Sequence, residues 1–516
     1  MREPAAVTVA VGAGALSPGD VVAVARKGAT VELTPAARRG MSERRAVLET
    51  LATSGRAVYG ISTGFGALAS VPIALDRRSE LQEALVRSHA AGMGDPVERE
   101  VVRAMMVLRA RTLATALPGA RPEVAEALIG MLNAGITPVV PEHGSLGASG
   151  DLAPLAHVAL ALIGEGRVTG PDGAALPAAQ ALKEAGLNPL RLEVKEGLSL
   201  INGTDGMLGM LVLACADAAV LLKTADVAAA MSTEALLGTD RAFAADLHSI
   251  RPHPGQLASA SNLIRLLAGS GVVASHRHSD HSVQDSYSVR CHPQVAGAAR
   301  DTLAFATEVA GRELAGAVDN PVVLADGRVE STGNFHGAPL GFACDFLAIA
   351  AAEAGAISER RLDRILDPAR SQGLPPFLAA EAGVHSGLML GQYTAAALVA
   401  ENRRLAAPAS VDSLPTSGMQ EDHVSMGWGA ARKLRRVLVN LSRILAIEAV
   451  CAARALSLRA PLEPAPGTTA ARDLVNDRTG GPGPDRELAP ELATGAELVR
   501  SGALLAAAEG AVGELA

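Results

Sequence analysis

Residues 144–151, GSLGASGD, bring two serines and three glycines together between two apolar segments. A flexible tether would have polar surroundings, which this stretch lacks. A tight turn before a helix explains Asp151 as an N-cap and Pro154 in the first turn, but it leaves the three glycines unexplained. Glycine allows backbone angles that other residues disfavour, and serine can act as a nucleophile. This stretch is therefore the first candidate for chemistry.

Two standard motifs match the stretch poorly. The nucleophile elbow of serine hydrolases reads GxSxG, whereas the residues around Ser149 read GASGD, with the second glycine one position early. A phosphate-binding loop needs a lysine after its last glycine, and Asp151 stands there instead.

The histidine-rich stretch SHRHSDHS, residues 275–282, could supply metal ligands. Its His276, His278 and His281 offer imidazole nitrogens, and Asp280 offers carboxylate oxygens. The stretch has neither the HExxH spacing nor thiolates, so we expect no metal site.

Four further loops carry reactive side chains between predicted helices. Taken alone, each has a structural explanation: a packed tyrosine, a turn before glycine, a surface loop and a solvated helix end. In chain order, their candidate residues are Tyr59; Asn202; Gln284, Tyr287 and Arg290; and Glu421.

The overall composition excludes several classes of protein. A net charge of −8 and a pI near 5.9 argue against nucleic-acid binding, which needs a basic face. The four cysteines form no CxxC pair and indicate buried thiols in a reducing compartment. Acidic residues interrupt the most apolar segments, so no run of roughly 20 residues predicts a membrane span. We expect a cytoplasmic protein.

The elements that must position these loops are mostly helices. Hydrophobic residues make up 49% of the chain and aromatic residues only 2%, so the core consists of small and aliphatic side chains that let helices pack closely. Apolar residues between 434 and 447 follow one helix face, and Ala-rich segments at 204–238, 338–366 and 380–406 indicate further long helices. The sequence predicts a mainly α fold with a long-helix central bundle and a small mixed α/β N-terminal region.

The predicted organisation has two regions that form one unit. Residues 1–110 form the mixed region, with a short VTVAV strand and the Tyr59 loop. Residues 111–516 form the helical core, with the GSLGASGD loop and the C-terminal helices. Residues 460–488 are rich in proline, glycine and charge, and we expect them to form a surface connector before a final helix.

The run GSLGASGDLAPLAH, residues 144–157, resembles the signature of the aromatic amino acid ammonia-lyase family. In that family an Ala-Ser-Gly triad cyclises and loses two waters to form an electrophile, 4-methylidene-imidazol-5-one (MIO). The resemblance implies that Ala148, Ser149 and Gly150 form MIO here, with a cross-link between Ala148 and Gly150 and a dehydrated Ser149. The residue types suit this chemistry. Gly150 has an unhindered amide nitrogen, Ser149 has a hydroxyl that can be eliminated, and Ala148 is small.

The resemblance spans nearly the whole chain. Blocks such as VYGISTGFG, KEGLSLINGTDGM, AVDNPVV, GNFHGAP and QEDHVSMG occur in the family's order, and they are most similar to members that act on histidine. Two loops depart from the family's usual pattern: Ser62 replaces an asparagine and Ser286 replaces a proline. The first affects a local hydrogen bond and the second affects loop rigidity, and neither touches a reacting group.

The resemblance implies the conversion of L-histidine to trans-urocanate and ammonia, the first step of histidine degradation. It assigns Tyr59 as the base that removes the β-proton, a role for which its phenol, with an ordinary pKa near ~10, needs help from its surroundings. It places Arg290 on the substrate carboxylate, where a guanidinium fork makes two charge-assisted bonds, and Gln284 beside it.

The remaining roles also follow from the resemblance. Asn202 and Tyr287 flank the MIO oxygen and the substrate amine, Phe335 walls the pocket, and His89 and Glu421 meet the imidazole. The resemblance further implies a homotetramer whose sites are shared between subunits, with no external cofactor, no metal, no nucleic acid and no membrane.

Three alternatives remain open. The same chemistry on phenylalanine or tyrosine, by a lyase or an aminomutase, is disfavoured by the pair Ser88-His89 and by Glu421, because such relatives tend to carry other residues there. A non-catalytic helical assembly protein would be credible if the triad or Tyr59 were absent, and both are present. A serine hydrolase would react with a fluorophosphonate probe.

Overall fold

The computed structural model of the chain forms two compact units, each built from segments far apart in the sequence. The residues that the structure describes are 7–53, 60–64, 66–68, 70–279 and 282–516. The first unit comprises Met1–Leu213, Thr307–Cys344 and Ala409–Arg432. The second unit comprises Ala214–Ala306, Asp345–Pro408 and Lys433–Ala516.

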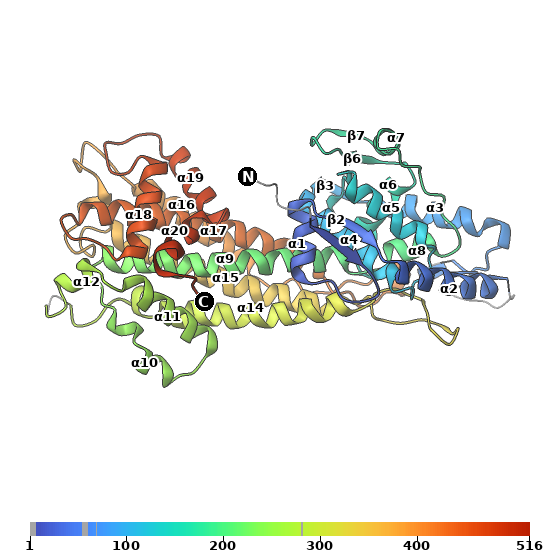
Figure 1. Ribbon diagram of the computed structural model, residues 1–516, viewed down its shortest axis with the longest axis horizontal. Coiled ribbons are helices and arrows are strands. Elements are labelled where there is room, and N and C mark those ends of the chain that lie inside the picture. Colours follow the sequence, from blue (N-terminus) through green and yellow to red (C-terminus); the bar gives the residue numbers. More distant parts are fainter. Residues whose placement is uncertain (1–6, 54–59, 65, 69, 280–281) are drawn as a thin grey trace. The chain divides into compact units, whose positions relative to one another are not determined.

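Long helices dominate the chain, and the boundary between the units falls inside four of them (Figure 1). These four helices are α9 (Asp205–Ala235), α14 (His292–Ala315), α15 (Ala338–Leu366) and α17 (Gly427–Leu458). In α17 the apolar positions predicted to share one face, from Leu434 to Ile447, are all buried. The prediction of a mainly α fold with long helices is confirmed.

The N-terminal part of the first unit is the predicted mixed α/β region. Strands β1 (Thr8–Val11) and β2 (Thr30–Leu33) pair in parallel, and α1 (Pro18–Lys27) connects them. Helix α1 begins where Ser17 and Asp20 form a capping box, and it ends at a left-handed glycine.

The rest of the first unit surrounds a helix that is buried on nearly every side, α4 (Arg99–Ala114). Its other helices are α2 (Pro35–Ala52), α3 (Arg78–His89), α5 (Pro122–Asn133), α6 (Leu152–Leu162), α7 (Ala178–Glu184), α8 (Glu196–Ile201) and the 3₁₀ turns η1 (Gly66–Leu68), η2 (Leu75–Arg77) and η5 (Ser417–Met419). Its short strands are β3 (Met93–Pro96) with β5 (Pro141–His143), β6 (Arg167–Thr169) between β4 (Thr137–Pro138) and β7 (Ala175–Pro177), and β8 (Val322–Val323) with β9 (Val329–Glu330).

In the described residues of the second unit, helices joined by loops form the regular secondary structure. Its shorter helices are α10 (Ala245–Ser249), α11 (Pro254–Leu267), α12 (Gly271–Ser275), α13 (Tyr287–Arg290), α16 (Met389–Leu405), α18 (Pro466–Thr479), α19 (Leu488–Arg500), α20 (Ala503–Val512) and the 3₁₀ turns η3 (Arg241–Phe243) and η4 (Pro376–Leu378).

Helix α18 corrects the expectation that residues 460–488 are only a surface connector. Pro466 occupies the first turn, where a missing N–H costs nothing, and Gly480 ends the helix in the left-handed conformation. Between them Ala471 and Val475 are buried, and the helix packs against α20. The proline and the glycine therefore mark the ends of a helix, and a continuous loop would not need them.

Two helical stretches, Glu196–Ala235 and Ala338–Leu366, are long and apolar enough to cross a membrane by length and composition alone. In their most apolar parts, 78% and 61% of the residues are buried inside the structure, as in the core helices of a water-soluble protein. These helices are therefore weak grounds for a membrane assignment.

Candidate active site

Three helices of the first unit pack against one another and bring three predicted site segments together. Helix α3 ends at His89, α6 begins directly after the Ala148-Ser149-Gly150 triad, and α8 is followed by Asn202. Helices α3, α6 and α8 are in mutual contact. The ends of a small helical cluster therefore position residues that are more than 100 positions apart in the sequence.

The triad itself lies in a tight left-handed turn. Ser149 has φ 54°, and the flanking Gly147 and Gly150 have φ 75° and 84°. The amide of Gly150 donates to the carbonyl of Gly147 at 3.4 Å. A Cβ atom on Gly150 would lie 2.1 Å from the carbonyl oxygen of Gly203, so only glycine fits there. The backbone is therefore tightly bent at the triad, with no room for a side chain at Gly150.

Neighbouring segments fix this turn. The Ser145 hydroxyl accepts from the amide of Gly147 at 3.2 Å and donates to Asp151 Oδ1 at 3.1 Å. The amide of Asp151 donates to the carbonyl of Gly203 at 2.7 Å, and the carbonyl of Leu146 accepts from the amide of Met426 at 2.9 Å.

Asp151 corrects the simple capping expectation. It occupies the N-cap position of α6, but its side chain makes no capping bond to that helix. Its Oδ2 accepts instead from the amide of Met207, in the first turn of α9, at 2.9 Å. Burial raises the pKa of the Asp151 carboxyl to about 7, against the opposing effect of the bonds from Met207 and Ser145. Asp151 is therefore a buried, partly protonated acid one residue beyond the triad.

Asn202 is only 2% exposed, and only one of its two side-chain amide atoms has a hydrogen-bond partner among the described residues. Its Nδ2 donates to the carbonyl of Asn320 at 2.9 Å, and its Oδ1 has no partner among the described residues. A buried oxygen without a partner costs about 1–3 kcal/mol, so Asn202 Oδ1 is available to accept a hydrogen bond from a bound molecule.

The turn that follows Asn202 rests on a buried ion pair. Arg109 Nε donates to Asp205 Oδ2 at 3.0 Å, and Arg109 Nη1 donates to the carbonyls of Ser199 and Asn202 at 3.0 and 3.3 Å. Arg109 comes from α4 and has no exposed surface. It lies so close to Gly203 that a Cβ there would overlap the guanidinium.

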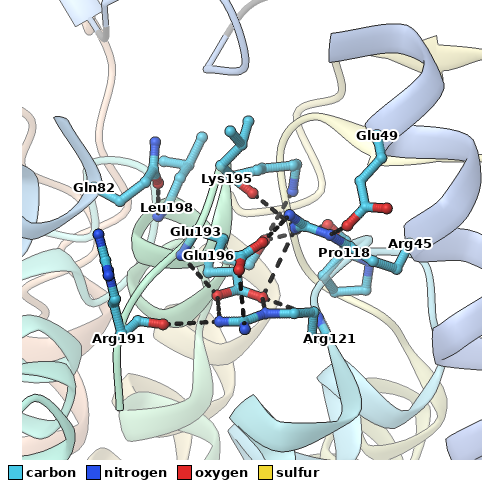
Figure 2. A network of polar contacts seen from close by, with 12 residues as sticks. Arg45, Glu49, Gln82, Pro118, Arg121, Arg191, Glu193, Lys195, Glu196 and Leu198 are labelled. Atoms are coloured by element: carbon cyan, nitrogen blue, oxygen red, sulfur yellow. Dashed lines mark hydrogen bonds and ion pairs between the residues drawn. The ribbon is translucent and has the colours of Figure 1, made fainter. Parts of the chain in front are cut away.

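The start of α8 is held by a second charged network (Figure 2). Figure 2 shows Arg121 and Arg45 converging on the Glu193–Glu196 turn. Arg121 Nη2 lies 2.7 Å from Glu196 Oε2, and Arg45 Nη2 lies 3.1 Å from Glu193 Oε2. Both ends of α8 are therefore fixed by buried or half-buried arginines.

His89 and Glu421 lie near enough for the Glu421 carboxylate to affect the imidazole. Burial lowers the pKa of His89, while its bond to Leu85 and the charge of Glu421 raise it by less. His89 Nδ1 donates to the carbonyl of Leu85 at 2.9 Å, which leaves Nε2 as an acceptor in the neutral ring. Glu421 Oε2 accepts from the hydroxyl of Thr416 at 2.8 Å.

Residues 66–67, in the loop that carries Tyr59, lie close to the segment that contains Glu421. Tyr59 itself lies outside the described residues. Further along this loop, the amide of Ala67 donates to the Ser417 hydroxyl at 3.2 Å, and a Cβ on Gly66 would lie 3.9 Å from Glu421 Oε1. His336, next to Phe335, also lies near this segment. Its ring stacks on that of His423, with 5.6 Å between the ring centroids.

The second unit holds Gln284, Tyr287 and Arg290. Tyr287 begins α13 and is 72% exposed, and the Arg290 guanidinium lies 4.6 Å from the centroid of its ring. Arg290 Nε donates to the carbonyl of Asp285 at 3.0 Å. Ser286, which replaces the family's proline, has φ −61°, an angle that proline also adopts. The substitution therefore leaves this backbone conformation accessible.

A fully buried network supports this segment. Arg361 Nη2 donates to Glu448 Oε2 at 2.9 Å, and Arg361 Nη1 donates to the carbonyl of Ser288 at 3.2 Å and to His292 Nδ1 at 3.0 Å. His292 Nε2 then donates to Asp226 Oδ1 at 2.8 Å. Burial lowers the pKa of His292, more strongly than Asp226 raises it, which keeps the ring neutral.

The histidine-rich stretch shows no metal-binding arrangement in its described part. His276 Nε2 lies 3.0 Å from the carbonyl oxygen of Gly238. Across the described residues, no group of three or more His, Cys, Asp or Glu side chains could hold a metal ion. Asp280 and His281 lie outside the described residues.

Sequence reasoning missed the supporting residues Arg109, Asp151, Asp205, Lys195 and Asp319. An available signal was the presence of charges in otherwise apolar segments, such as Arg109 within MMVLRARTLA. A charge on a helix with no polar face must find a buried partner.

Comparison with known proteins places this geometry in context. Residues 16–477 match the family described as aromatic amino acid lyase. Histidine ammonia-lyase of Streptomyces avermitilis is 60% identical over 99% of this chain and 100% of its own length. That of Streptomyces coelicolor is 59% identical over 98% of this chain and 99% of its own length.

Solved structures agree in fold over nearly the whole chain. Histidine ammonia-lyase from Trypanosoma cruzi is 38% identical with a TM-score of 0.90, covering 98% of this chain and 96% of its own. Tyrosine aminomutase from Streptomyces globisporus is also 38% identical, with a TM-score of 0.93, covering 99% of this chain and 100% of its own.

Proposed function

This chain belongs to the aromatic amino acid lyase family, and from that premise we propose that it converts L-histidine to trans-urocanate and ammonia. It is a carbon–nitrogen lyase. Its matches to histidine ammonia-lyases at 49–60% identity over nearly the whole chain carry the choice of L-histidine and of a role in histidine catabolism.

The observation that carries the chemistry is the geometry of the triad. Ser149 and Gly150 both adopt left-handed angles, and the carbonyl of Gly203 leaves no room for a side chain on Gly150. These features fit the cyclisation of Ala148-Ser149-Gly150 to MIO, held between Gly147 and Asp151. When formed, MIO supplies an electrophilic methylene that makes the substrate nitrogen a better leaving group.

The chain's own side chains complete the reaction in this proposal. Tyr59 removes the β-proton, the electrons of that C–H bond form the Cα–Cβ double bond, and the C–N bond breaks so that the nitrogen departs and is released as ammonia. Arg290 and Gln284 bind the carboxylate, because a guanidinium and an amide offer fixed donors. Asn202 and Tyr287 flank the reacting nitrogen.

Substrate choice rests on His89 and Glu421. An imidazole has two ring nitrogens that donate or accept hydrogen bonds. The neutral His89 ring presents an acceptor at Nε2, and the Glu421 carboxylate lies near enough to raise the pKa of this ring slightly. Phe335 supplies an apolar wall. Phenylalanine would leave these polar groups without partners, which costs binding free energy.

A second candidate is the same chemistry on tyrosine or phenylalanine. The likeness to a tyrosine aminomutase at a TM-score of 0.93 supports it, because the fold alone does not separate the two activities. The histidine ammonia-lyases at higher identity favour histidine.

We also propose a cytoplasmic homotetramer with sites shared between subunits, in which residues 1–110 and 111–516 form one catalytic unit. In the second unit the ring centroids of Phe305 and Phe346 lie 6.0 Å apart. Both side chains, and that of Ile349 one helical turn after Phe346, are more than two-fifths exposed. Exposed apolar groups of this kind support burial against another copy.

The test is a side-by-side assay of the purified protein with L-histidine, L-phenylalanine and L-tyrosine. We expect urocanate from histidine, with the other two amino acids disfavoured by on the order of 10⁴-fold in kcat/KM. Comparable turnover of phenylalanine or tyrosine would move the assignment to another activity of the family. Size-exclusion chromatography with light scattering tests the tetramer in the same preparation.

A further inference from the structure

The orientation of the Asn202 amide is chemically determined. Its Nδ2 lies 2.9 Å from the carbonyl oxygen of Asn320, and exchanging the amide nitrogen and oxygen would place two acceptors face to face. The Oδ1 atom is therefore the free end of the amide, and it is buried without a partner among the described residues. An oxygen can only accept, so whatever completes this site must bring an N–H or O–H.

A buried ion pair holds the residue whose carbonyl accepts from this amide. Asp319 Oδ1 accepts from the amide of Asn320 at 2.8 Å, and Asp319 Oδ2 accepts from Lys195 Nζ at 2.6 Å. Asp319 and Lys195 are each 1% exposed. The Asn320 side chain is fixed as well, since its Oδ1 accepts from the amide of Thr332 at 2.9 Å.

The two ends of α8 are attached to this same Asp319-Asn320 segment. Lys195 precedes the helix and binds Asp319, while Asn202 follows the helix and binds Asn320. Lys195 Nζ also donates to Ser199 Oγ inside the helix at 3.0 Å. In Figure 2, Lys195 lies beside the arginine–glutamate network that holds the first turn. The helix and the segment therefore form one rigid bracket around Asn202.

The bracket also lies directly beside the triad. Gly203, the residue after Asn202, accepts from the amide of Asp151, the residue after Gly150, at 2.7 Å. A movement of Asn202 would therefore shift Gly203 and, through this hydrogen bond, Asp151 next to the triad.

We propose that Asp319 is a positioning residue of the ammonia-lyase reaction: held by Lys195, it binds the Asn320 N–H and so orients the Asn320 backbone, whose carbonyl holds the Asn202 amide with its oxygen free to accept a hydrogen bond from the substrate amino group. This inference rests on the proposed function and adds to it a defined polarity for Asn202. In this proposal the acceptor takes an N–H of the substrate ammonium or amine, whereas the MIO ring carries no N–H or O–H to donate.

The test compares two double variants that both lack the ion pair, so that neither Lys195 nor Asp319 is left as an unpaired buried charge. In Lys195→Met/Asp319→Asn, the new amide oxygen can still accept from the Asn320 N–H. In Lys195→Met/Asp319→Ala, that acceptor is lost. We expect the alanine version to lose about 10²-fold more kcat on L-histidine than the asparagine version, with little change in KM, because a small misplacement of a reacting group has effects of this size. Equal kcat values in the two variants would overturn the proposal.

A double-mutant cycle separates positioning from general damage. In an Asn202→Ala background, exchanging asparagine for alanine at position 319 should have no further effect on kcat, because the group being positioned is gone. Additive losses would contradict the proposal. Triad-peptide mass measured in every variant shows whether the electrophile still forms, and Arg328→Gln, on the exposed β8–β9 hairpin, is a matched control expected to match the wild type.

A third variant does not depend on removing the ion pair. Asn202→Asp keeps an acceptor oxygen but loses the N–H that binds the Asn320 carbonyl, so we expect it to be as impaired as Asn202→Ala. Activity of Asn202→Asp near that of the wild type would overturn the proposal. If the wild type released ammonia from another aromatic amino acid, the proposed substrate would fail, and the same variants assayed on that amino acid would still decide the role of Asp319.

Discussion

The chain presents its proposed site residues on two short helices that differ in surroundings. In the first unit, α8 leads to Asn202, which is 2% exposed. In the second unit, α13 begins at Tyr287, which is 72% exposed. Each helix is anchored by fully buried charges, Arg109–Asp205 and Lys195–Asp319 for the first and Arg361–Glu448 with His292–Asp226 for the second.

The two groups of residues differ in how far their own unit buries them. The residues around the triad are held by hydrogen bonds within their own unit, so the triad and its neighbours are preorganised inside it. The residues proposed to bind the carboxylate lie beside a buried network, but Tyr287 is mostly exposed. This exposure agrees with the proposed sharing of sites between subunits.

The largest effect is expected at the triad, in the first unit. Ser149→Ala removes the hydroxyl that must be eliminated, so we expect at least a 10³-fold loss of kcat for L-histidine, more than about 4 kcal/mol of barrier. The helices should be retained, because the turn depends on Gly147 and Gly150. Urocanate absorbance and far-UV circular dichroism measure the two outcomes, and activity within about tenfold of the wild type would contradict the triad's role.

The anchoring networks should matter for stability in both units. Arg361→Met strands the buried Glu448 carboxylate and should destabilise the protein by about 3–5 kcal/mol, while Arg361→Met/Glu448→Leu should recover most of that loss. Arg109→Met and Arg109→Met/Asp205→Leu are the matched pair in the first unit. Denaturant midpoints compare the four variants. Single variants as stable as the wild type would show that these networks do not anchor the helices.

Substrate specificity should depend on residues of the first unit alone. His89→Leu with Glu421→Gln removes the groups proposed to meet the imidazole, and we expect about a 10²-fold loss of kcat/KM for L-histidine with little change for L-phenylalanine. Competition assays that follow urocanate and cinnamate measure both. An equal loss on both substrates would mean that these residues serve the fold and not the imidazole.

A smaller effect concerns pH and Asp151. Its pKa is raised to about 7 in the fold from 3.8, so the folded state keeps a proton that the unfolded state loses. Its contribution to stability is complete below pH 3.8 and is lost as pH rises toward 7, by on the order of a few kcal/mol. Asp151→Asn cannot titrate, so its stability relative to the wild type should increase between pH 4 and 7. Parallel pH curves for the two proteins would refute the assignment.

The sequence predicted those features that a local pattern of residues marks. The Ala148-Ser149-Gly150 triad stands in one run, and the apolar face of α17 repeats at helical spacing. The placement of Tyr59 remains a prediction. The family resemblance supplied the roles of distant residues such as Arg290.

The supporting contacts could not be read from local patterns. Arg109 and Asp205 are 96 residues apart, and Lys195 and Asp319 are 124 apart, so only the folded chain shows which charges meet. Asp151 has the sequence of an N-cap, yet its side chain binds the first turn of α9 because a buried carboxylate takes the nearest free amide. Helix α18 was hidden because its flanking proline and glycine also occur in loops.

One measurement tests the central claim directly: the mass of the proteolytic peptide that contains residues 148–150. If the tightly bent turn cyclises and Ser149 is dehydrated, the wild-type peptide should be lighter than its sequence by two water molecules, and the Ser149→Ala peptide should not show this double loss. A wild-type peptide of unmodified mass from an active preparation would contradict the account.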